Sequence, residues 1–171
     1  VVQVWKPKQL NTFETEWGFS CMGYEISGAL GIKMAKPDQD VVVFVGDGSY
    51  LLNNTDIYSS VIYDQKLIII VCDNGGHMVI NRLQLAKGGK EYICNLRAAR
   101  ATNLKFVDFE NHAKSMGANA ETVSSTSELE AAYKRAKDSD KTYVITIKTH
   151  GYEWLEGAGV PGAAPWPGST A

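Results

Sequence analysis

The chain has 171 residues, of which 44% are hydrophobic and 21% charged, and its formal net charge at pH 7 is −2. This is the composition of one ordinary globular domain that can bury a core, and so small a charge gives no electrostatic reason to expect nucleic acid as a partner. No apolar run approaches the roughly 18 residues of a membrane span and no pattern is typical of a signal peptide, so we expect no membrane partner.

The first predicted helix runs from the stretch Glu16–Ile26 to about Ala35 and ends before Pro37. Met22 in this stretch is open to a structural interpretation, because flexible thioethers commonly fill gaps in a core. Glu25 lies near the amino end of the helix, where a carboxylate is more often a cap or a partner of the helix dipole than a catalytic group. We therefore assign no chemistry to Glu25.

A buried strand is predicted over Val41–Val45, because the segment is continuously apolar and β-branched. It ends at Gly46-Asp47-Gly48, where the two glycines allow a sharp turn and a close approach of the backbone to a ligand. Ser49 stands where a following helix would begin. The geometry favours binding of an anion.

A helix over Thr55–Tyr63 and a second buried strand over Leu67–Cys72 complete a strand-helix-strand unit. In a right-handed crossover the two strands are parallel, so Asp47 and Asn74 should emerge at the carboxyl edge of the sheet, where open α/β folds bind ligands. Two oxygen ligands are thus predicted to converge there.

An aspartate, an asparagine amide and a carbonyl of the flexible loop Asp73–Gly76 form an oxygen-only set that suits Mg²⁺ or Ca²⁺ and not zinc. Mg²⁺ would still need phosphate or water to complete its octahedron, so a diphosphate bridged to the protein by the metal is the economical ligand. A lone Gly-Asp-Gly is more often a plain turn, and it is the second motif that favours the site.

The remaining predicted elements alternate between helix and strand, which indicates an α/β fold, a doubly wound parallel sheet with helices on both faces. They are a helix over Phe106–Met116 entered through Asp108, a strand over Ala120–Val123, a helix over Ser127–Ala136 and a strand over Tyr143–Lys148.

The segment 81–103 has several basic residues and little periodicity, so we predict a loop with room for a short helix. Loops of this length are usually functional or mobile, and this one could cover a cofactor or become ordered with it. A solvated basic loop is an equally good interpretation.

The three cysteines are an odd number at wide spacing, which favours reduced, buried thiols and a cytoplasmic protein. They are Cys21, Cys72 and Cys94. Among the histidines, His77 follows the glycine loop and either contacts the cofactor or substrate or lies on the loop surface. We assign no role to His112 or His150.

The spacing of the two motifs resembles that of the thiamine diphosphate enzymes, whose cofactor domain carries Gly-Asp-Gly, a spacer and an asparagine pair. Here 24 residues separate Gly48 from Asp73, which replaces the usual first asparagine. The resemblance implies Mg²⁺ bound by the Asp47 carboxylate, the Asn74 side chain and the Gly76 carbonyl. The cofactor-binding residues that it implies are Ser20, Met22, Gly46, Asp47, Gly48, Ser49, Asn74, Gly76, His77 and Met78.

The stretch around Met22 is similar to that of the acetolactate-synthase-like branch, where a methionine wedges between the two cofactor rings. The resemblance implies this role for Met22 and a backbone contact of Ser20 with the aminopyrimidine. Within the family, several stretches resemble hydrolases that open a cyclic 1,2-diketone in myo-inositol catabolism. These stretches are Trp5–Lys8, Ser20–Ile26, Val45–Leu51 and Ile80–Gln84.

The resemblance therefore implies a C-terminal domain, residues 1–156, of a longer hydrolase, followed by a flexible Gly/Pro/Ala-rich tail over 157–171. The activating glutamate would lie on a missing pyrimidine-binding domain of the same or another subunit, so this chain would hold no catalytic residue and be inactive alone. The full-length enzyme is expected to be a homo-oligomer, a dimer or tetramer, acting on a small-molecule substrate. Two alternatives stay open: an acetolactate-synthase-like or 2-oxoacid decarboxylase-like enzyme, and a non-catalytic docking domain.

Overall fold

Four parallel strands form the central sheet of the structure, a computed structural model that describes residues 5–15, 19, 21–100, 103 and 106–153. Their spatial order is β1-β2-β4-β3, and all neighbouring pairs are parallel. The strands are β1 (Val42–Gly46), β2 (Ile68–Asp73), β3 (Asn119–Val123) and β4 (Tyr143–Lys148). The four predicted strands are confirmed to within one residue at each end.

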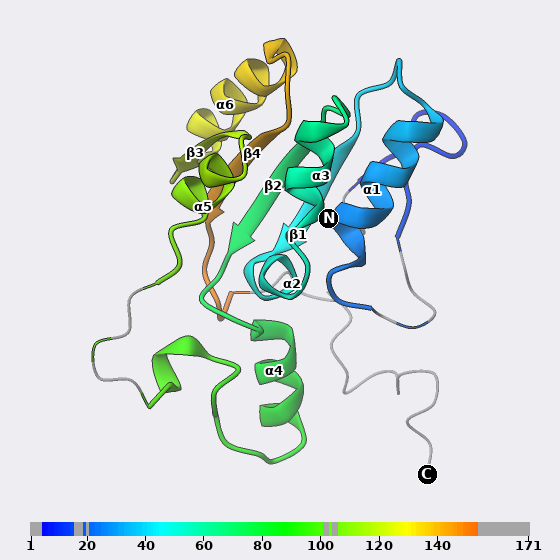
Figure 1. Cartoon of the computed structure of the whole chain (residues 1–171). Coiled ribbons are helices and arrows are strands. Elements are labelled where there is room, and N and C mark those ends of the chain that lie inside the picture. Colours follow the sequence, from blue (N-terminus) through cyan, green and yellow to red (C-terminus); the bar gives the residue numbers. More distant parts are fainter. Residues whose placement is uncertain (1–4, 16–18, 20, 101–102, 104–105, 154–171) are drawn as a thin grey trace.

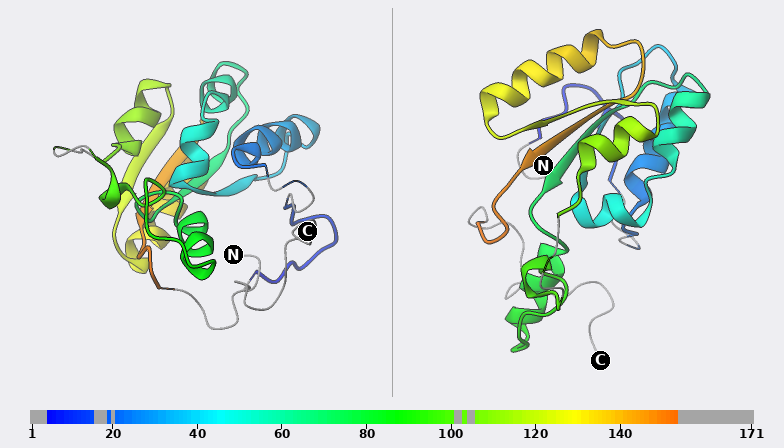
Figure 2. Two further views of the ribbon diagram at one scale, coloured as in Figure 1. Left: turned by 90° about the horizontal axis from the view of Figure 1, so that it is seen from below. Right: turned by 60° about the vertical axis from the view of Figure 1, so that its left-hand side comes forward.

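Helices cover both faces of the sheet (Figure 1), which confirms the predicted doubly wound arrangement. The helices are α1 (Tyr24–Ala35), α2 (Asp47–Leu52), α3 (Asp56–Ile62), α4 (Met78–Ala86), α5 (Phe109–Ser115) and α6 (Thr126–Asp138), with a short 3₁₀ turn at Leu96–Ala98. Helices α1, α2, α3 and α5 pack on one face, and α6 lies alone on the other (Figure 2). Helix α4 lies beyond the carboxyl ends of the strands.

The strand β2 is buried because both of its faces meet a core. Ile69 and Val71 belong to the larger core beneath α1, α3 and α5, while Ile68 points to the smaller core beneath α6. Alternate side chains of a strand point to opposite faces, so a strand covered on both sides has to be apolar throughout. This explains why the run over Leu67–Cys72 lacks the alternation of a half-exposed strand.

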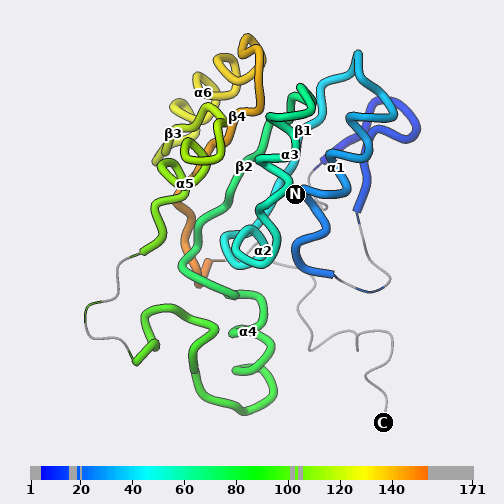
Figure 3. The backbone as a smooth tube through the Cα atoms, viewed as in Figure 1, coloured from blue at the N-terminus to red at the C-terminus, as the bar shows by residue number. Residues whose placement is uncertain are grey.

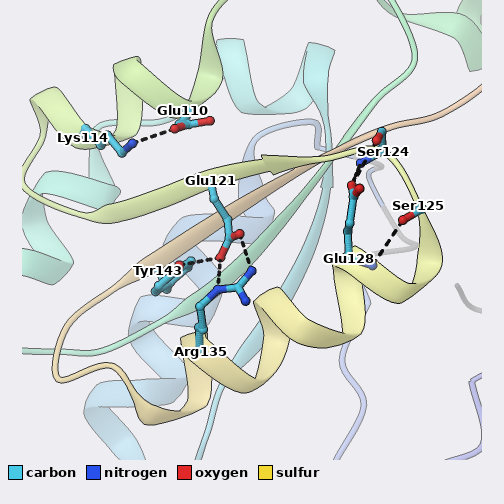
Figure 4. A network of polar contacts seen from close by, with 8 residues as sticks. All are labelled: Glu110, Lys114, Glu121, Ser124, Ser125, Glu128, Arg135 and Tyr143. Atoms are coloured by element: carbon cyan, nitrogen blue, oxygen red, sulfur yellow. Dashed lines mark hydrogen bonds and ion pairs between the residues drawn. The ribbon is translucent and has the colours of Figure 1, made fainter.

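Helix α6 is fastened to the sheet by polar contacts as well as by its core face (Figure 4). The guanidinium of Arg135 donates two hydrogen bonds to the carboxylate of Glu121 on β3, at 2.9 and 2.5 Å. The hydroxyl of Tyr143 on β4 donates to the same carboxylate at 2.6 Å. At the start of the helix, Ser125 is the N-cap and its Oγ accepts the Glu128 N–H at 3.3 Å.

Several helix boundaries differ from prediction, among them the start of α5 at Phe109 and not at Phe106, and the end of α6 at Asp138 and not at Ala136. Helix α2 begins at Asp47 and not at Ser49, because Gly46 is the last extended residue and serves as the N-cap. Helix α4 occupies the first part of the segment predicted as a loop over 81–103. Its inward face includes Asn81, whose amide is buried and hydrogen bonded, so the apolar periodicity that would have indicated a helix is interrupted.

The other differences concern the cysteines and the chain end. The three cysteines form no disulfide with one another, but Cys21 is exposed and Cys72 and Cys94 are only partly buried, so the prediction of buried thiols is wrong. The tail predicted over 157–171 and the domain boundary at 156 lie outside the described residues. In the described ranges, no helix combines the length and apolar character needed to cross a membrane.

Candidate cofactor site

The ends of β1 and β2 bring two motifs together at one edge of the sheet. Gly46 pairs with Cys72 in the parallel register, so Asp47 follows its strand at the level where β2 ends. One carboxylate oxygen of Asp47, Oδ2, accepts the N–H groups of Gly75 at 3.0 Å and Gly76 at 2.6 Å. The acidic residue after the first strand is thereby joined to the glycine turn after the second.

Three oxygen-bearing groups converge beside this contact. In the orientation that satisfies its hydrogen bonds, the Asn74 side-chain nitrogen donates to Asp47 Oδ1 at 3.1 Å and to the Gly76 carbonyl oxygen at 2.9 Å. The opposite orientation would aim the amide oxygen at the same two oxygens, and only a bound cation would stabilise that arrangement. Asp47, Asn74 and Gly76 can thus present one carboxylate, one amide and one carbonyl oxygen to a single ion.

The chemistry of this set favours a hard cation. Among the described residues, no three His, Cys, Asp or Glu side chains gather to hold a metal, so no thiolate or imidazole site competes with it. Carboxylate, amide and carbonyl oxygens are the ligands of Mg²⁺ and Ca²⁺. The residues present fit a Mg²⁺ ion that takes its remaining ligands from water or phosphate.

Burial has a cost for Asp47, which is only 2% exposed. Desolvation raises the pKa of its carboxyl above the usual value, and the nearby charge of Asp73 adds to the rise. The backbone N–H groups of Gly76 and Gly75 act in the opposite direction without cancelling it. A cation at this place would favour the charged carboxylate and relieve the cost.

The glycine turn has a conformation that other residues rarely adopt. Gly75 has φ +88° and Gly76 has φ +135°. A Cβ on Gly76 would lie 2.4 Å from the Cys94 carbonyl oxygen, so a side chain has no room there. The segment after α4 closes on the turn, since His77 N–H donates to Cys94 O at 2.8 Å and Leu96 N–H to Gly75 O at 3.0 Å.

The start of α2 borders the same place. A Cβ on Gly48 would lie 2.4 Å from His77 Nδ1, so the imidazole rests on this glycine, whereas a Cβ on Gly46 would meet nothing within 4 Å. The structure therefore brings His77 beside the Gly-Asp-Gly turn and leaves open space at Gly46. Ser49 is buried, and α2 has only six residues, so its dipole can add little and a cation has to carry most of the attraction for a diphosphate.

The side chain of Tyr50 on α2 is fully buried and packs into the core. Its hydroxyl hydrogen bonds to His112 Nδ1 at 2.9 Å, and its ring packs edge-on against Phe109 with centroids 5.1 Å apart. His112 on α5 thus has a structural contact, in agreement with the absence of an assigned chemical role.

Asp73, the departure from the usual asparagine, has a partner that the sequence motif did not indicate. Its carboxylate forms an ion pair with Lys148, the residue paired with it on β4. Asp73 Oδ1 also accepts the Gly75 N–H at 3.3 Å. The extra negative charge beside Asp47 is therefore compensated by a cation from the neighbouring strand.

Met22 and Met78 have different surroundings. Met22 is 38% exposed and so does not fill the core. It precedes Gly23, the N-cap of α1, where an added Cβ would lie 2.9 Å from that of Asn53 at the end of α2. Met78 is only 3% exposed, and a Cβ on Gly151 would lie 3.0 Å from its Cε, so the geometry gives no support to a contact of the Met78 side chain with a ligand.

Two of the remaining residues complete the comparison with prediction. Glu25 accepts the Gly23 N–H at 2.8 Å through its side chain, which confirms that it caps α1. Ser20 lies outside the described residues.

A further group of polar residues, spread over α4, the segment after it and the chain after β4, was not predicted because no motif connects them: Asn81, Glu91, Asn95 and Tyr152.

Comparisons with known proteins agree with this geometry. Residues 1–147 match the family model of the thiamine pyrophosphate enzyme, C-terminal TPP binding domain. The chain is 38% identical over 157 residues to the 3D-(3,5/4)-trihydroxycyclohexane-1,2-dione hydrolase of Halalkalibacterium halodurans, covering 88% of this chain and 24% of the relative. It is 36% identical over 157 residues to the enzyme of the same name from Bacillus subtilis, again covering 88% and 24%.

A solved structure shows the same fold. The thiamine diphosphate-dependent 4-hydroxybenzoylformate decarboxylase of Rhodococcus jostii RHA1 superposes with a TM-score of 0.62 at 24% identity, covering 75% of this chain and 23% of that one. The chain spans about a quarter of the length of the curated relatives that it matches.

Proposed function

Because this chain belongs to the thiamine pyrophosphate (thiamine diphosphate) enzymes, as a C-terminal TPP-binding domain, we propose that it holds the cofactor's diphosphate through Mg²⁺ within a larger hydrolase. The relatives are named hydrolases of trihydroxycyclohexane-1,2-dione. In this proposal the full-length enzyme likewise opens a cyclic 1,2-diketone and acts in the cytoplasm, in myo-inositol catabolism. The observation that supports the metal and diphosphate role is the convergence of Asp47, Asn74 and the Gly76 carbonyl.

The residues of this chain divide the binding between them. Asp47, Asn74 and Gly76 supply three oxygen ligands to the cation, whose remaining positions are left to diphosphate and water. Gly46, Gly48 and Ser49 border the diphosphate, and the His77 ring, resting on Gly48, lies on the same side. Ser20 and Met22 contact the ring end of the cofactor.

When bound, thiamine diphosphate supplies an electron sink for cleavage of a C–C bond beside a carbonyl. The domain proposed here orients that cofactor and keeps its diphosphate neutralised. The glutamate that activates the cofactor belongs, in this proposal, to a pyrimidine-binding domain of the same or another subunit. The assembled enzyme is a homo-oligomer.

Substrate profiling of the full-length protein tests the proposed reaction. With thiamine diphosphate and Mg²⁺ present, we expect ring opening of trihydroxycyclohexane-1,2-dione and no turnover of pyruvate. Turnover of pyruvate or another 2-oxoacid, with none of the cyclic dione, would instead favour an acetolactate-synthase-like or decarboxylase-like enzyme.

The metal and cofactor role is tested separately by calorimetry of thiamine diphosphate with and without Mg²⁺. We expect heat of binding only when both are present. No binding even with the pyrimidine-binding domain supplied would overturn the cofactor role and favour a docking domain.

A further inference from the structure

The turn that carries the Gly76 carbonyl is held in place from outside the predicted motif, through the residues on either side of Gly76. The segment 94–96 grips the glycine turn through main-chain hydrogen bonds, and Gly76 forms an antiparallel bridge with Asn95. Figure 3 shows the backbone after α4 turning back toward the start of that helix. Contacts that hold this returning segment, residues 94–96, in place therefore also hold the glycine turn in place.

A single carboxylate, that of Glu91, connects the returning segment to its surroundings. Glu91 Oε1 accepts hydrogen bonds from Asn81 Nδ2 at 2.9 Å and from the Tyr152 hydroxyl at 2.6 Å. Glu91 Oε2 accepts one from Asn95 Nδ2 at 3.3 Å. The three donors come from α4, from the segment that grips the turn and from the chain after β4.

The amides that meet Glu91 are costly to leave without a partner. Asn81 is 1% exposed and Asn95 is 4% exposed, and an unsatisfied buried amide costs more than its hydrogen bond contributes. Asn95 is doubly engaged, because its Oδ1 also accepts the Arg97 N–H at 3.0 Å. The Tyr152 hydroxyl and the two amides lower the pKa of Glu91, which agrees with an ionised acceptor.

We propose that Glu91 is a positioning residue for the cation site: through Asn95 it fixes the turn that aims the Gly76 carbonyl at Asp47 and Asn74. Glu91 contacts neither the ion nor the cofactor and acts through the returning segment. The inference rests on the proposed function, because it gives Glu91 a role only if the three oxygens bind a cation. It adds a residue outside both sequence motifs to the machinery of the site.

The test is a titration of the 171-residue chain with Mn²⁺ alone, in which the electron paramagnetic resonance signal of the free ion reports binding. Groups that support metal ligands typically contribute 10- to 100-fold in affinity. We expect Glu91→Ala to weaken Mn²⁺ binding by about that factor. The control is Glu110→Ala, which removes a glutamate paired with Lys114 on α5, and should leave the affinity unchanged.

Graded variants separate positioning from general stability. Glu91→Gln keeps an oxygen for Asn81 and Tyr152 but turns an amide toward Asn95, so its affinity should lie between those of wild type and Glu91→Ala. Tyr152→Phe, at an exposed position, removes the donor to Glu91 Oε1 and the hydroxyl that accepts from Asn95 Nδ2 at 2.5 Å, and it should give a smaller loss than Glu91→Ala with the fold intact. Nuclear magnetic resonance of the Gly75 and Gly76 amides in this variant, without Mn²⁺, should show shifted signals.

Unchanged Mn²⁺ affinity in folded Glu91→Gln and Tyr152→Phe would overturn the positioning role while leaving the proposed function intact. The positioning role would also be overturned if the loss of Mn²⁺ affinity merely followed the loss in melting temperature. This would be the case if Glu110→Ala, with an equal loss in melting temperature, lost as much affinity as the Glu91 variants. If wild type itself fails to bind Mn²⁺ while the Tyr152→Phe signals still shift, the cation role of the proposed function has failed, and the role of Glu91 falls with it.

Discussion

The carboxylate of Asp47 is the one charged group among the three oxygens that meet at the strand edge. It is nearly inaccessible to solvent, and its burial raises the pKa of the carboxyl. Two backbone N–H groups stabilise the charge but occupy one of its oxygens, Oδ2. The other oxygen, Oδ1, faces Asn74, and is the one available to an ion.

Asp47→Ala should therefore abolish metal-dependent cofactor binding, because it removes the only charged protein ligand. Calorimetry with thiamine diphosphate and Mg²⁺ measures the loss. Asp140→Ala, which changes an exposed aspartate, should bind like wild type. Wild-type affinity in Asp47→Ala would mean that the metal ligands are assigned wrongly.

Gly76→Ala should lower the free energy of unfolding by more than the roughly 1–2 kcal/mol that a left-handed conformation costs a residue with a Cβ. The reason is that its Cβ would also collide with the Cys94 carbonyl oxygen. Gly88→Ala is the matched control, since Gly88 has φ +80° but open space around it. Urea denaturation measures the loss in free energy of unfolding for each variant. Equal losses would show that the Cys94 carbonyl can move aside and does not constrain the turn.

At the scale of elements, the pairing of β2 with β4 joins Asp73 to Lys148, and the two partners differ in exposure. The Asp73 side chain is 7% exposed and that of Lys148 is 54% exposed. Removing the cation leaves a buried charge, whereas removing the carboxylate leaves a cation that water can solvate. The two single substitutions should thus have unequal effects.

Lys148→Met should lower the free energy of unfolding by roughly 1–3 kcal/mol, the usual cost of a buried polar group without its partner. Asp73→Asn should cost less, and the double variant should resemble Asp73→Asn. Denaturation of all three variants closes a double-mutant cycle. Additive effects would indicate that the ion pair does not form in solution.

The ion pair that attaches α6 to β3 should make the stability of the fold depend on pH. The hydrogen bonds of Arg135 lower the pKa of Glu121 below its ordinary 4.5, against the opposing effect of burial. A carboxyl with a lowered folded-state pKa adds stability that is complete above the unfolded value and is lost as the pH falls through the folded value. The contribution should therefore be complete above about pH 4.5, decline as the pH falls below this value, and vanish only below the lowered folded-state pKa.

Glu121→Gln should accordingly be less stable than wild type at pH 7, by under about 1 kcal/mol because Arg135 is half exposed, and equally stable at low pH. Thermal unfolding from pH 7 downward measures the difference. If the difference in stability between the two proteins stays constant with pH, the ion pair of Glu121 and Arg135 is not its cause.

The sequence predicts these elements unequally well, for physical reasons. The strands β1 and β2 are apolar runs that are easy to recognise, and Asp47 and Asn74 follow directly from where these two runs end. The strand β3 is weaker, because Asn119, Glu121 and Thr122 interrupt its apolar residues. Helix α4 was predicted only as a short helix that the loop could contain, because its buried face includes a polar residue, Asn81, whose side chain donates to Glu91. Such a long-range pairing of polar residues leaves no periodic signal in a sequence.

At the scale of the whole molecule, the chain contains the three oxygen-bearing groups that we propose bind the cation, but it covers about a quarter of its relatives' length. Most of the substrate pocket would therefore belong to other domains. In the proposed function the chain supplies the diphosphate-binding half of the cofactor site, and a Cβ on Gly46 would meet nothing within 4 Å.

The chain alone should bind thiamine diphosphate weakly and show no turnover, because the activating glutamate is expected elsewhere. Adding the pyrimidine-binding domain should raise cofactor affinity and restore ring opening of the cyclic dione. Mixing experiments with the separate domains, followed by calorimetry and an activity assay, measure both effects. Turnover by the chain alone would place a catalytic group within it.

The side chain of Asn74 has a consequence for how an ion enters. In the orientation that satisfies its hydrogen bonds, the Asn74 side-chain nitrogen donates to both Asp47 Oδ1 and the Gly76 carbonyl oxygen. Half a turn of the amide about its last torsion replaces the two donors by an oxygen and leaves the main chain where it was. If the proposed cation role holds, binding of the ion would require only the rotation of this one amide group.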